Sequence, residues 1–282
     1  MNLNKLKVNF QYFMPKQLLT RLIGFIASAK LGKFTTFLIK QFIANYRVNT
    51  QEMVGTISDY ETFNDFFSRP LKNNARPINK DKKSIVFPAD GKISQFGTLT
   101  EGFILQAKNH YYTAEALLGG DDGKIFKNGK FITVYLSPKD YHRVHIPFAG
   151  TLKKMTYIPG ELFSVNPLYA ENIPELFSRN ERVVCIFDTE IGKMAVVLVG
   201  ATIVRSITTQ WAGVVAPNKS REITTFEYND QNIKFNKGDE IGKFTMGSTV
   251  ICLFEKNSVD FEKSLETQIP TKVGEKMAST HK

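Results

Sequence analysis

Apolar residues recur at helical spacing in two stretches near the start of the chain. The first stretch follows Pro15, a residue suited to the first turn of a helix, and the second begins near Phe34. The apolar positions are Leu18, Leu19, Leu22, Ile23 and Ile26 in the first stretch and Phe34, Phe37, Leu38 and Phe42 in the second. We therefore predict two amphipathic helices, each with lysines and arginines beside its apolar stripe.

Two shorter helices are also predicted from their end signals. Ser58-Asp59-Tyr60-Glu61 matches a capping box, and three phenylalanines follow it on one helical face. Because proline disfavours helix in the residue before it, this helix should end at Arg69-Pro70. The other helix should cover Ala114–Leu118, with Thr113 as its cap and Gly119-Gly120 as its stop.

Beyond Pro70 the hydrophobic period changes from helical to two. Five segments rich in Val, Ile, Thr and aromatic residues are predicted strands: 131–136, 183–187, 194–204, 223–228 and 249–254. Long helices do not alternate with these strands, so a doubly wound parallel sheet is disfavoured. The pattern predicts an α+β fold: an antiparallel β-rich core with amphipathic helices gathered at the N-terminus.

Composition and charge narrow the classes of protein. The chain has 282 residues, of which 42% are hydrophobic and 23% charged, a composition that argues against disorder and coiled coils. Cys185 and Cys252 lack metal-ligand or CxxC spacing, which argues against a zinc ribbon or a disulfide-stapled scaffold and favours a reducing compartment. The net charge is +10, and residues 1–50 carry eight basic and no acidic side chains.

The basic N-terminal segment has several possible roles. No stretch reaches the roughly 18–20 apolar residues that span a bilayer. Ala27-Ser28-Ala29 resembles a signal-peptide cleavage site, but Arg21 interrupts the apolar stretch before it, and a mitochondrial transit peptide would be richer in Arg and Ser. Amphipathic helices on an anionic membrane surface fit best, with packing on the protein's own domain as the alternative. Nucleic-acid binding lacks a recognised motif.

Candidate chemistry lies in three short segments. His142 and His145 are three residues apart and precede a proline, so in an extended segment they point to opposite sides and serve different tasks rather than one metal ion. Asp90 lies at an Asp-Gly turn, and Gly247-Ser248 precede a predicted strand. Together the segments offer a base, an orienting carboxylate and a hydroxyl, the components of an activated nucleophile.

Seven short motifs follow one another along the chain: Phe66–Lys72, Pro88–Gly91, Tyr141–Pro147, Gly160–Asn166, Arg179–Arg182, Gly200–Thr202 and Met246–Thr249. Their order and spacing resemble those of the pyruvoyl-dependent phosphatidylserine decarboxylases of the bacterial type. Two positions depart from that pattern: Met246 stands where the family usually has Leu, and Arg205 where Gly is expected.

The resemblance implies a self-cleaving enzyme with a basic helical segment (1–50) and a catalytic domain (51–282). The cut falls between Gly247 and Ser248 and yields chains 1–247 and 248–282. Ser248 becomes a covalent pyruvoyl group, so neither metal nor pyridoxal phosphate is expected. The resemblance also implies that during self-cleavage His145 accepts the proton of the Ser248 hydroxyl and Asp90 orients His145.

The pyruvoyl group then forms a Schiff base with phosphatidylserine, which loses CO2 to give phosphatidylethanolamine. Either His142 or His145 could return a proton to the substrate. The expected partners are phosphatidylserine and the anionic membrane surface, with the enzyme peripheral on the cytoplasmic side of the cell membrane. The two chains form a heterodimer that could dimerise further, and no nucleic acid is expected.

Two other functions remain open from the sequence. A serine hydrolase could use Asp90, His145 and Ser248 on an external ester, although the chain lacks a G-x-S-x-G elbow. A non-enzymatic basic protein could bind membranes or nucleic acid through residues 1–50. That function would leave the two histidines and Gly247-Ser248 without a special role.

Overall fold

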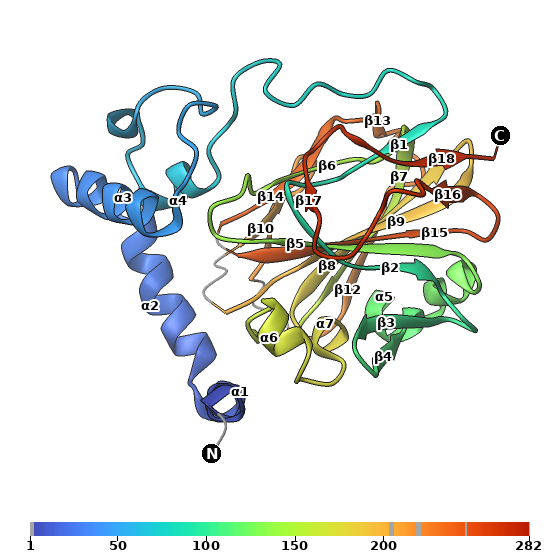
Figure 1. The fold of residues 1–282 in the computed structure, drawn as a ribbon, viewed down its shortest axis with the longest axis horizontal. Coiled ribbons are helices and arrows are strands. Elements are labelled where there is room, and N and C mark those ends of the chain that lie inside the picture. The colour runs from blue at the N-terminus through green and yellow to red at the C-terminus, as the bar shows by residue number, and fades with distance from the viewer. Residues whose placement is uncertain (1–2, 203–205, 218–220, 246, 282) are drawn as a thin grey trace.

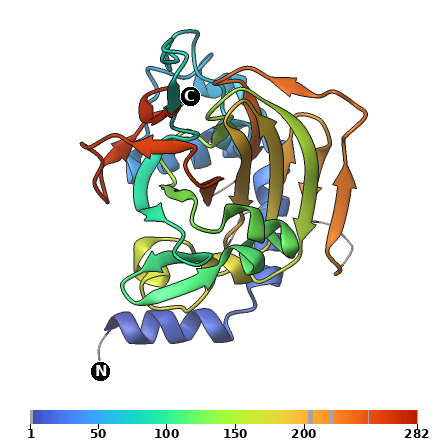
Figure 2. The same ribbon diagram turned by 90° about the vertical axis from the view of Figure 1, so that its right-hand side faces the viewer.

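Three helices open the chain and lie beside a β-rich body (Figure 1). The computed structural model describes residues 3–202, 206–217, 221–245 and 247–281. The helices are α1 (Leu3–Phe13), α2 (Lys16–Ser28) and α3 (Lys33–Tyr46), so the two predicted amphipathic helices are confirmed. The sequence pattern did not predict α1, which lies along one end of the molecule in Figure 2 and contacts α6 (Pro167–Ala170).

None of the described helices is by itself long and apolar enough to cross a membrane. Leu18–Ser28 and Lys33–Tyr46 reach that length and composition only as a pair, and the chain bends by 116° between them.

The third predicted helix exists, but its start differs from the prediction. The capping box is formed by Thr56 and Asp59 around the short 3-10 helix η1 (Ile57–Asp59), not by Ser58 and Glu61. The helix α4 (Phe63–Phe67) begins later, and the Thr62 hydroxyl accepts a hydrogen bond from the Asp65 amide. Several hydroxyl and carboxylate side chains near residue 60 could serve as caps, and local spacing did not single out the correct one.

The helices α2, α3 and α4 share a small hydrophobic core of their own. Phe42 of α3 lies at its centre, with ring centroids 5.1 Å from Phe63 and 5.9 Å from Phe67. The buried members of this core are Ala27, Ile39, Val48, Met53, Phe63, Phe66 and Phe67. Packing therefore continues across residue 50, where the sequence suggested a boundary between segments.

A nine-stranded antiparallel sheet forms most of the β-rich body. Its strand order is β12-β7-β8-β9-β15-β5-β2-β17, and β13 also pairs with β7. These strands are β2 (Gly91–Thr98), β5 (Lys130–Leu136), β7 (Gly150–Ile158), β8 (Arg182–Thr189), β9 (Gly192–Val199), β12 (Thr224–Glu227), β13 (Lys234–Phe235), β15 (Ser248–Phe254) and β17 (Pro270–Thr271). The antiparallel pairing confirms the predicted fold class.

Smaller sheets and short helices surround this sheet. Three sheets have the orders β1-β18-β16, β11-β10-β14-β6 and β3-β4. Their strands are β1 (Ser84–Val86), β3 (Phe103–Ala107), β4 (His110–Thr113), β6 (Arg143–His145), β10 (Ile207–Thr209), β11 (Gly213–Ala216), β14 (Glu240–Phe244), β16 (Val259–Phe261) and β18 (Lys276–Thr280). The remaining helices are α5 (Ala114–Leu118), the 3-10 helix η2 (Asp121–Phe126) and α7 (Leu176–Arg179).

Most of the sequence-predicted elements coincide with observed ones. The helix α5 has the predicted bounds, its Thr113 cap, and Gly119 in the left-handed conformation at its end. Four of the five predicted strands match β5, β8, β12 and β15 within two residues. The strand predicted to reach residue 204 instead ends at Val199, and residues 203–205 lie outside the described part of the chain.

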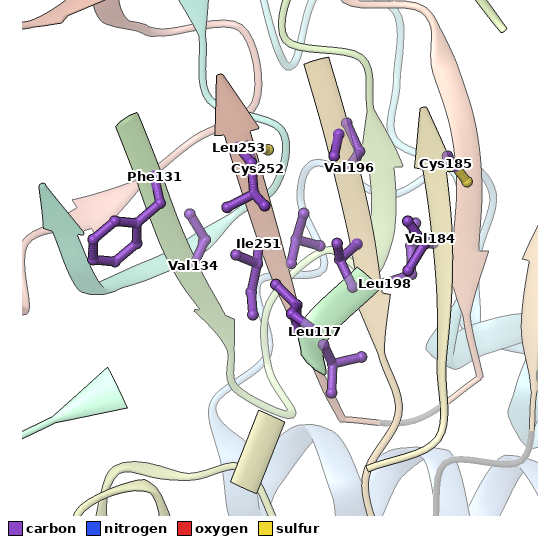
Figure 3. Close-up of a cluster of buried hydrophobic side chains, with 14 of the residues drawn as sticks. Leu117, Phe131, Val134, Val184, Cys185, Val196, Leu198, Ile251, Cys252 and Leu253 are labelled. Atoms are coloured by element: carbon purple, nitrogen blue, oxygen red, sulfur yellow. The ribbon is translucent and has the colours of Figure 1, made fainter. Parts of the chain in front are cut away.

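The strand β15 lies at the centre of the hydrophobic core (Figure 3). It pairs with β5 on one side and β9 on the other, and all seven of its residues are buried. Side chains such as Ile251, Leu198 and Leu117 pack together in this region. The strand β15, although it lies near the C-terminal end of the sequence, is therefore in the middle of the nine-stranded sheet rather than at its edge.

Replacing Ile251 by alanine should lower the free energy of unfolding by about 2–5 kcal/mol, because the side chain is fully buried and leaves a cavity. Urea unfolding measures this loss in a chain that also carries Ser248→Ala, since the implied self-cleavage would otherwise divide the chain before Ile251. Val214→Ala is the matched control, since Val214 is 67% exposed and its loss should cost less than about 0.5 kcal/mol. Equal losses in the two variants would contradict the central position of β15.

Candidate active site

Ser248 begins the central strand at the point where the chain leaves a cavity. It lies opposite Leu136 of β5 and is fully buried. Gly247, one residue earlier, lines the cavity, and a Cβ atom added to it would meet no atom within 4 Å beyond its two chain neighbours. The peptide bond between the two residues therefore joins a residue beside the cavity to one held by the sheet.

His142 is the histidine that contacts Ser248. Its Nδ1 atom lies 3.5 Å from the Ser248 hydroxyl oxygen. Its Nε2 atom lies 3.1 Å from the Ser137 carbonyl oxygen, which can only accept, so Nε2 carries the proton and Nδ1 presents its lone pair to Ser248. The imidazole also stacks on Phe67, with ring centroids 4.2 Å apart.

Burial lowers the pKa of His142 to about 3, and the nearby positive charge of Arg69 acts in the same direction. The side chain is 0% exposed, so the charged form would lose its hydration. His142 is therefore neutral near pH 7 in this structure.

His145 lies in different surroundings. Its Nδ1 donates to the Gly238 carbonyl at 2.8 Å, and its Nε2 accepts from the Tyr141 hydroxyl at 3.1 Å. Burial lowers the pKa of His145, while the charges of Glu240 and Asp90 favour its protonated form. The two histidines thus have separate partners, as their spacing in an extended segment predicts.

The expected contact between Asp90 and His145 is not formed. The Arg76 guanidinium instead binds the Asp90 carboxylate, with Nε 2.9 Å from each carboxylate oxygen. The Val273 amide also donates to Asp90, at 2.9 Å, and Arg76 reaches Glu52 as well. A guanidinium offers a carboxylate two parallel hydrogen bonds, which an imidazole does not, so Arg76 is the stronger partner.

Asp90, His145 and Ser248 therefore do not form the predicted hydrogen-bonded arrangement in this structure. Within the described residues, no hydrogen bond links His145 to Asp90 or to Ser248, although the charge of Asp90 acts on His145 through space. Arg76 is a site residue that the sequence pattern did not predict. Its partners are distant along the chain, and local spacing carries no signal for them.

A cavity of about 390 Å³ opens beside Gly247. One wall comes from the inner faces of α1, α2 and α3, and the other walls come from the β-rich body. Its volume is in the range usual for small-molecule sites. The lining residues are Gln11, Met14, Leu19, Phe42, Tyr46, Phe67, Tyr135, Pro138, Ser164, Val165, Asn166, Tyr169, Ala201, Thr202 and Gly247.

Polar contacts attach α1 to the wall of this cavity. The Gln11 side-chain oxygen accepts from the Ser164 amide at 3.2 Å and from the Thr202 hydroxyl at 3.4 Å. Lys16, at the start of α2, donates to the Gln11 carbonyl at 3.0 Å and lies 3.7 Å from the centre of the Phe163 ring. Gln11 was not predicted as a site residue, because a single amide in an aromatic-rich stretch has no distinctive pattern.

The remaining sequence features are the potential metal ligands, the two cysteines and the two positions that depart from the family pattern. Across the described ranges, no group of three or more His, Cys, Asp or Glu side chains could hold a metal ion. Cys185 and Cys252 are buried and unpaired, and burial raises the pKa of both thiols. Arg205 and Met246 lie outside the described residues.

Comparison with known proteins identifies the family to which the chain belongs. The phosphatidylserine decarboxylase family model matches residues 63–279, and a second model, described as PSD, matches residues 6–47. The first match alone covers more than half of the chain. The chain therefore belongs to the phosphatidylserine decarboxylase family.

Curated relatives support the same assignment over nearly the full length. A phosphatidylserine decarboxylase proenzyme of Aliivibrio fischeri (strain MJ11) is 54% identical over 277 residues, which is 96% of each chain. Proenzymes of the same name are 50% identical in Actinobacillus pleuropneumoniae serotype 3 (97% of this chain, 95% of the relative) and 52% identical in Shewanella loihica (98% and 99%).

Proposed function

We propose that this chain is a phosphatidylserine decarboxylase proenzyme that cuts itself at Gly247–Ser248 and then converts phosphatidylserine to phosphatidylethanolamine and CO2. The observation that carries the proposal is the position of Ser248. It is the first buried residue of β15, contacts His142 and follows a glycine that lines the cavity. Family membership over nearly the whole chain supports the same activity.

Self-cleavage uses only groups that the chain itself supplies, with one water molecule. The Ser248 hydroxyl attacks the Gly247 carbonyl carbon, which converts the peptide bond to an ester and frees the amine of residue 248. Loss of the Cα proton then breaks the Cβ–O bond and leaves Gly247 as a carboxylate. Water finally replaces the nitrogen of residue 248, which departs as ammonia. Glycine at 247 favours the first step because it leaves the carbonyl unshielded.

The surroundings of Ser248 fit a pyruvoyl group. The group would need to stay attached to a fixed chain end, beside a cavity and close to a proton donor. The pairing of β15 with β5 and β9, the adjoining cavity and His142 meet these three needs. When present, the pyruvoyl group supplies an electron acceptor for the bond that releases CO2.

We propose that the two histidines divide the proton transfers. Burial lowers the pKa of His145, which leaves the imidazole neutral and able to accept a proton, and the carboxylates of Glu240 and Asp90 would stabilise the imidazolium that forms. These surroundings suit the base that activates Ser248. Reaching His145 requires the Gly247–Ser248 peptide to move, and Gly247 lies at the wall of the cavity rather than inside the packed core. His142 already faces residue 248, so it is the proposed proton donor to the substrate carbon that has lost CO2.

The low pKa of His142 is compatible with that task. A substrate carboxylate in the cavity would be an opposing charge that raises the pKa of the imidazole and allows Nδ1 to take up a proton. Loss of the carboxylate as neutral CO2 removes this charge. The imidazolium then becomes a strong acid directed at residue 248.

The two other functions are less well supported. A serine hydrolase acting on an external ester is not supported by the family match, and the chain lacks a G-x-S-x-G elbow. A non-enzymatic protein that binds membranes or nucleic acid through residues 1–50 would not require the buried contact between Ser248 and His142 beside a cavity.

Ser248→Ala should remain a single uncut chain without decarboxylase activity, because the attacking hydroxyl is absent. The wild-type protein should give two chains on denaturing electrophoresis. Intact mass analysis should show that the smaller chain begins at residue 248 and carries a pyruvoyl group in place of serine. An active wild-type protein with an intact Ser248 would rule out the proposal.

His145→Ala should stay uncut, whereas His142→Ala should cut itself and then decarboxylate at least about 10²-fold more slowly, the usual contribution of general acid catalysis. Electrophoresis reports the first step, and CO2 release from phosphatidylserine in detergent micelles reports the second. His110→Ala, in β4, is the control and should retain both. An uncut His142→Ala chain would assign the base of self-cleavage to His142 instead.

We further propose that α1, α2 and α3 attach the enzyme to the surface of the cell membrane. Their outer faces carry large exposed apolar side chains, including Phe13 (85% exposed), Phe25 (72%) and Leu18 (67%). Exposed basic residues such as Arg21 and Lys33 lie on the same helices and suit anionic lipid headgroups. The anionic lipids of the cytoplasmic leaflet favour that side of the membrane.

This arrangement explains how a lipid substrate could reach the site. The inner faces of the same helices line the cavity beside Gly247. A phosphatidylserine molecule at the membrane surface would therefore lie next to the reactive residue without leaving the bilayer completely. The chains 1–247 and 248–282 would remain one unit on the membrane because β15 is buried between two strands of the larger chain.

The double variant Phe13→Ser/Phe25→Ser should bind vesicles at least tenfold more weakly, because burial of each large apolar side chain contributes about 1.5–3 kcal/mol. Flotation with phosphatidylglycerol–phosphatidylcholine vesicles, which contain no substrate, measures binding alone. Phe103→Ser is the matched control, since Phe103 is 50% exposed on β3 of the β-rich body. Equal weakening by the control would argue against these helices as the membrane contact.

A further inference from the structure

Arg69, at the end of α4, is a buried cation without an acidic partner. Arg69 is 3% exposed, and no described carboxylate forms an ion pair with its guanidinium group. Its Nη2 donates to the Lys139 carbonyl at 3.0 Å, and the guanidinium carbon lies 5.2 Å from the centre of the Phe66 ring. Its Nε and Nη1 atoms have no hydrogen-bond partner in the described part of the chain. Burying such a charge is costly, which points to a function.

The backbone contact of Arg69 lies in the turn that holds His142. Ser137 and Asp140 close this turn, with the Ser137 amide 2.8 Å and its hydroxyl 2.6 Å from the Asp140 carboxylate. The Ser137 carbonyl accepts the proton of His142 Nε2, and Arg69 holds the Lys139 carbonyl two residues later. Arg69 therefore supports the same short segment that determines which imidazole nitrogen carries the proton.

Groups from several elements surround the His142 ring. Phe67 of α4 stacks on it, Ser248 of β15 faces Nδ1, and the carbonyls of the 137–138 segment favour its protonated form. Among the described side chains, Arg69 is the charged group that acts on the His142 pKa. The other charged or titratable groups near this cluster, Tyr60, Asp140, Asp90 and Arg76, act on Arg69.

We infer that Arg69 is a positioning residue that holds His142 as the neutral Nε2–H tautomer, with Nδ1 free toward residue 248, until an anionic substrate arrives. The inference rests on the proposed role of His142 as proton donor. A cation at position 69 opposes premature protonation of the ring, and the carboxylate of phosphatidylserine offsets that cation. Protonation of His142 is thereby coupled to occupation of the cavity by a substrate with a carboxylate.

Nuclear magnetic resonance of the histidine ring nitrogens tests this inference without requiring activity. The sample is the uncut Ser248→Ala chain labelled with 15N-histidine, and the His142 signals are identified by their loss in an added His142→Ala variant. Signals are followed from pH 8 to pH 4, within the range where the amide spectrum remains that of the folded chain. With Arg69 present, His142 should show one neutral tautomer, protonated at Nε2, at every pH above 5.

Two substitutions separate the charge of Arg69 from its hydrogen bond. Arg69→Gln keeps a donor for the Lys139 carbonyl but loses the charge, so the pKa of His142 should rise by about one unit or more, or Nδ1-protonated ring should appear. Arg69→Lys keeps the charge, and its His142 signals should match those of the Arg69 chain. If Arg69→Gln does not fold, Arg69→Met, which retains an apolar stem against Phe66, replaces it.

Arg182→Gln is the matched control for the loss of a buried arginine. Arg182 is also 3% exposed, but it donates to the carbonyls of Leu117, Ala116 and Asn180. Its replacement should lower stability and leave the His142 signals unchanged. Identical His142 signals in the Arg69 and Arg69→Gln chains, or equal shifts in Arg69→Gln and Arg69→Lys, would overturn the inference.

The experiment also separates this inference from the proposed function. If the Arg69 variants shift the His142 signals as expected but His142→Ala decarboxylates at the wild-type rate, the role of His142 fails while the effect of Arg69 on the ring stands. If His142→Ala is inactive but the signals do not respond to the charge at position 69, the proposed function stands and the inference fails.

Discussion

The backbone pairing of β15 with β5 and β9 is the constraint on which the rest of the structure depends. It holds Ser248 in the core, while Gly247, one residue earlier, lines the cavity. The start of the sheet-paired strand coincides with the bond that is proposed to be cut. One side of the bond can therefore depart while the other keeps its position beside His142.

The N-terminal helices combine two surfaces that a lipid-modifying enzyme requires. Their inner faces line the cavity, and Gln11 attaches α1 to the cavity wall. Their outer faces expose large apolar side chains such as Phe13 and Phe25. The distance between the proposed membrane surface and the site is thus about the width of one helix layer, roughly 10 Å.

Periodicity in the sequence was sufficient for elements whose ends and faces are determined locally. The helices α2, α3 and α5 and the strand β15 follow from such patterns. Periodicity did not predict the side-chain contacts that join residues distant in the sequence. Asp90 is bound by Arg76 and by the Val273 amide, 14 and 183 residues away, and neither contact leaves a local pattern. The Ser248–His142 contact spans 106 residues, so motif order identified both residues but not which histidine lies beside the serine.

The position of β15 between β5 and β9 also restricts exchange of this strand between molecules. Because β15 is paired on both sides, its release would require opening of the core. If the chain is cut before Ser248 as proposed, the segment that begins at residue 248 would stay with the molecule in which it formed. A damaged residue 248 would therefore not be replaced by exchange of that segment with another molecule.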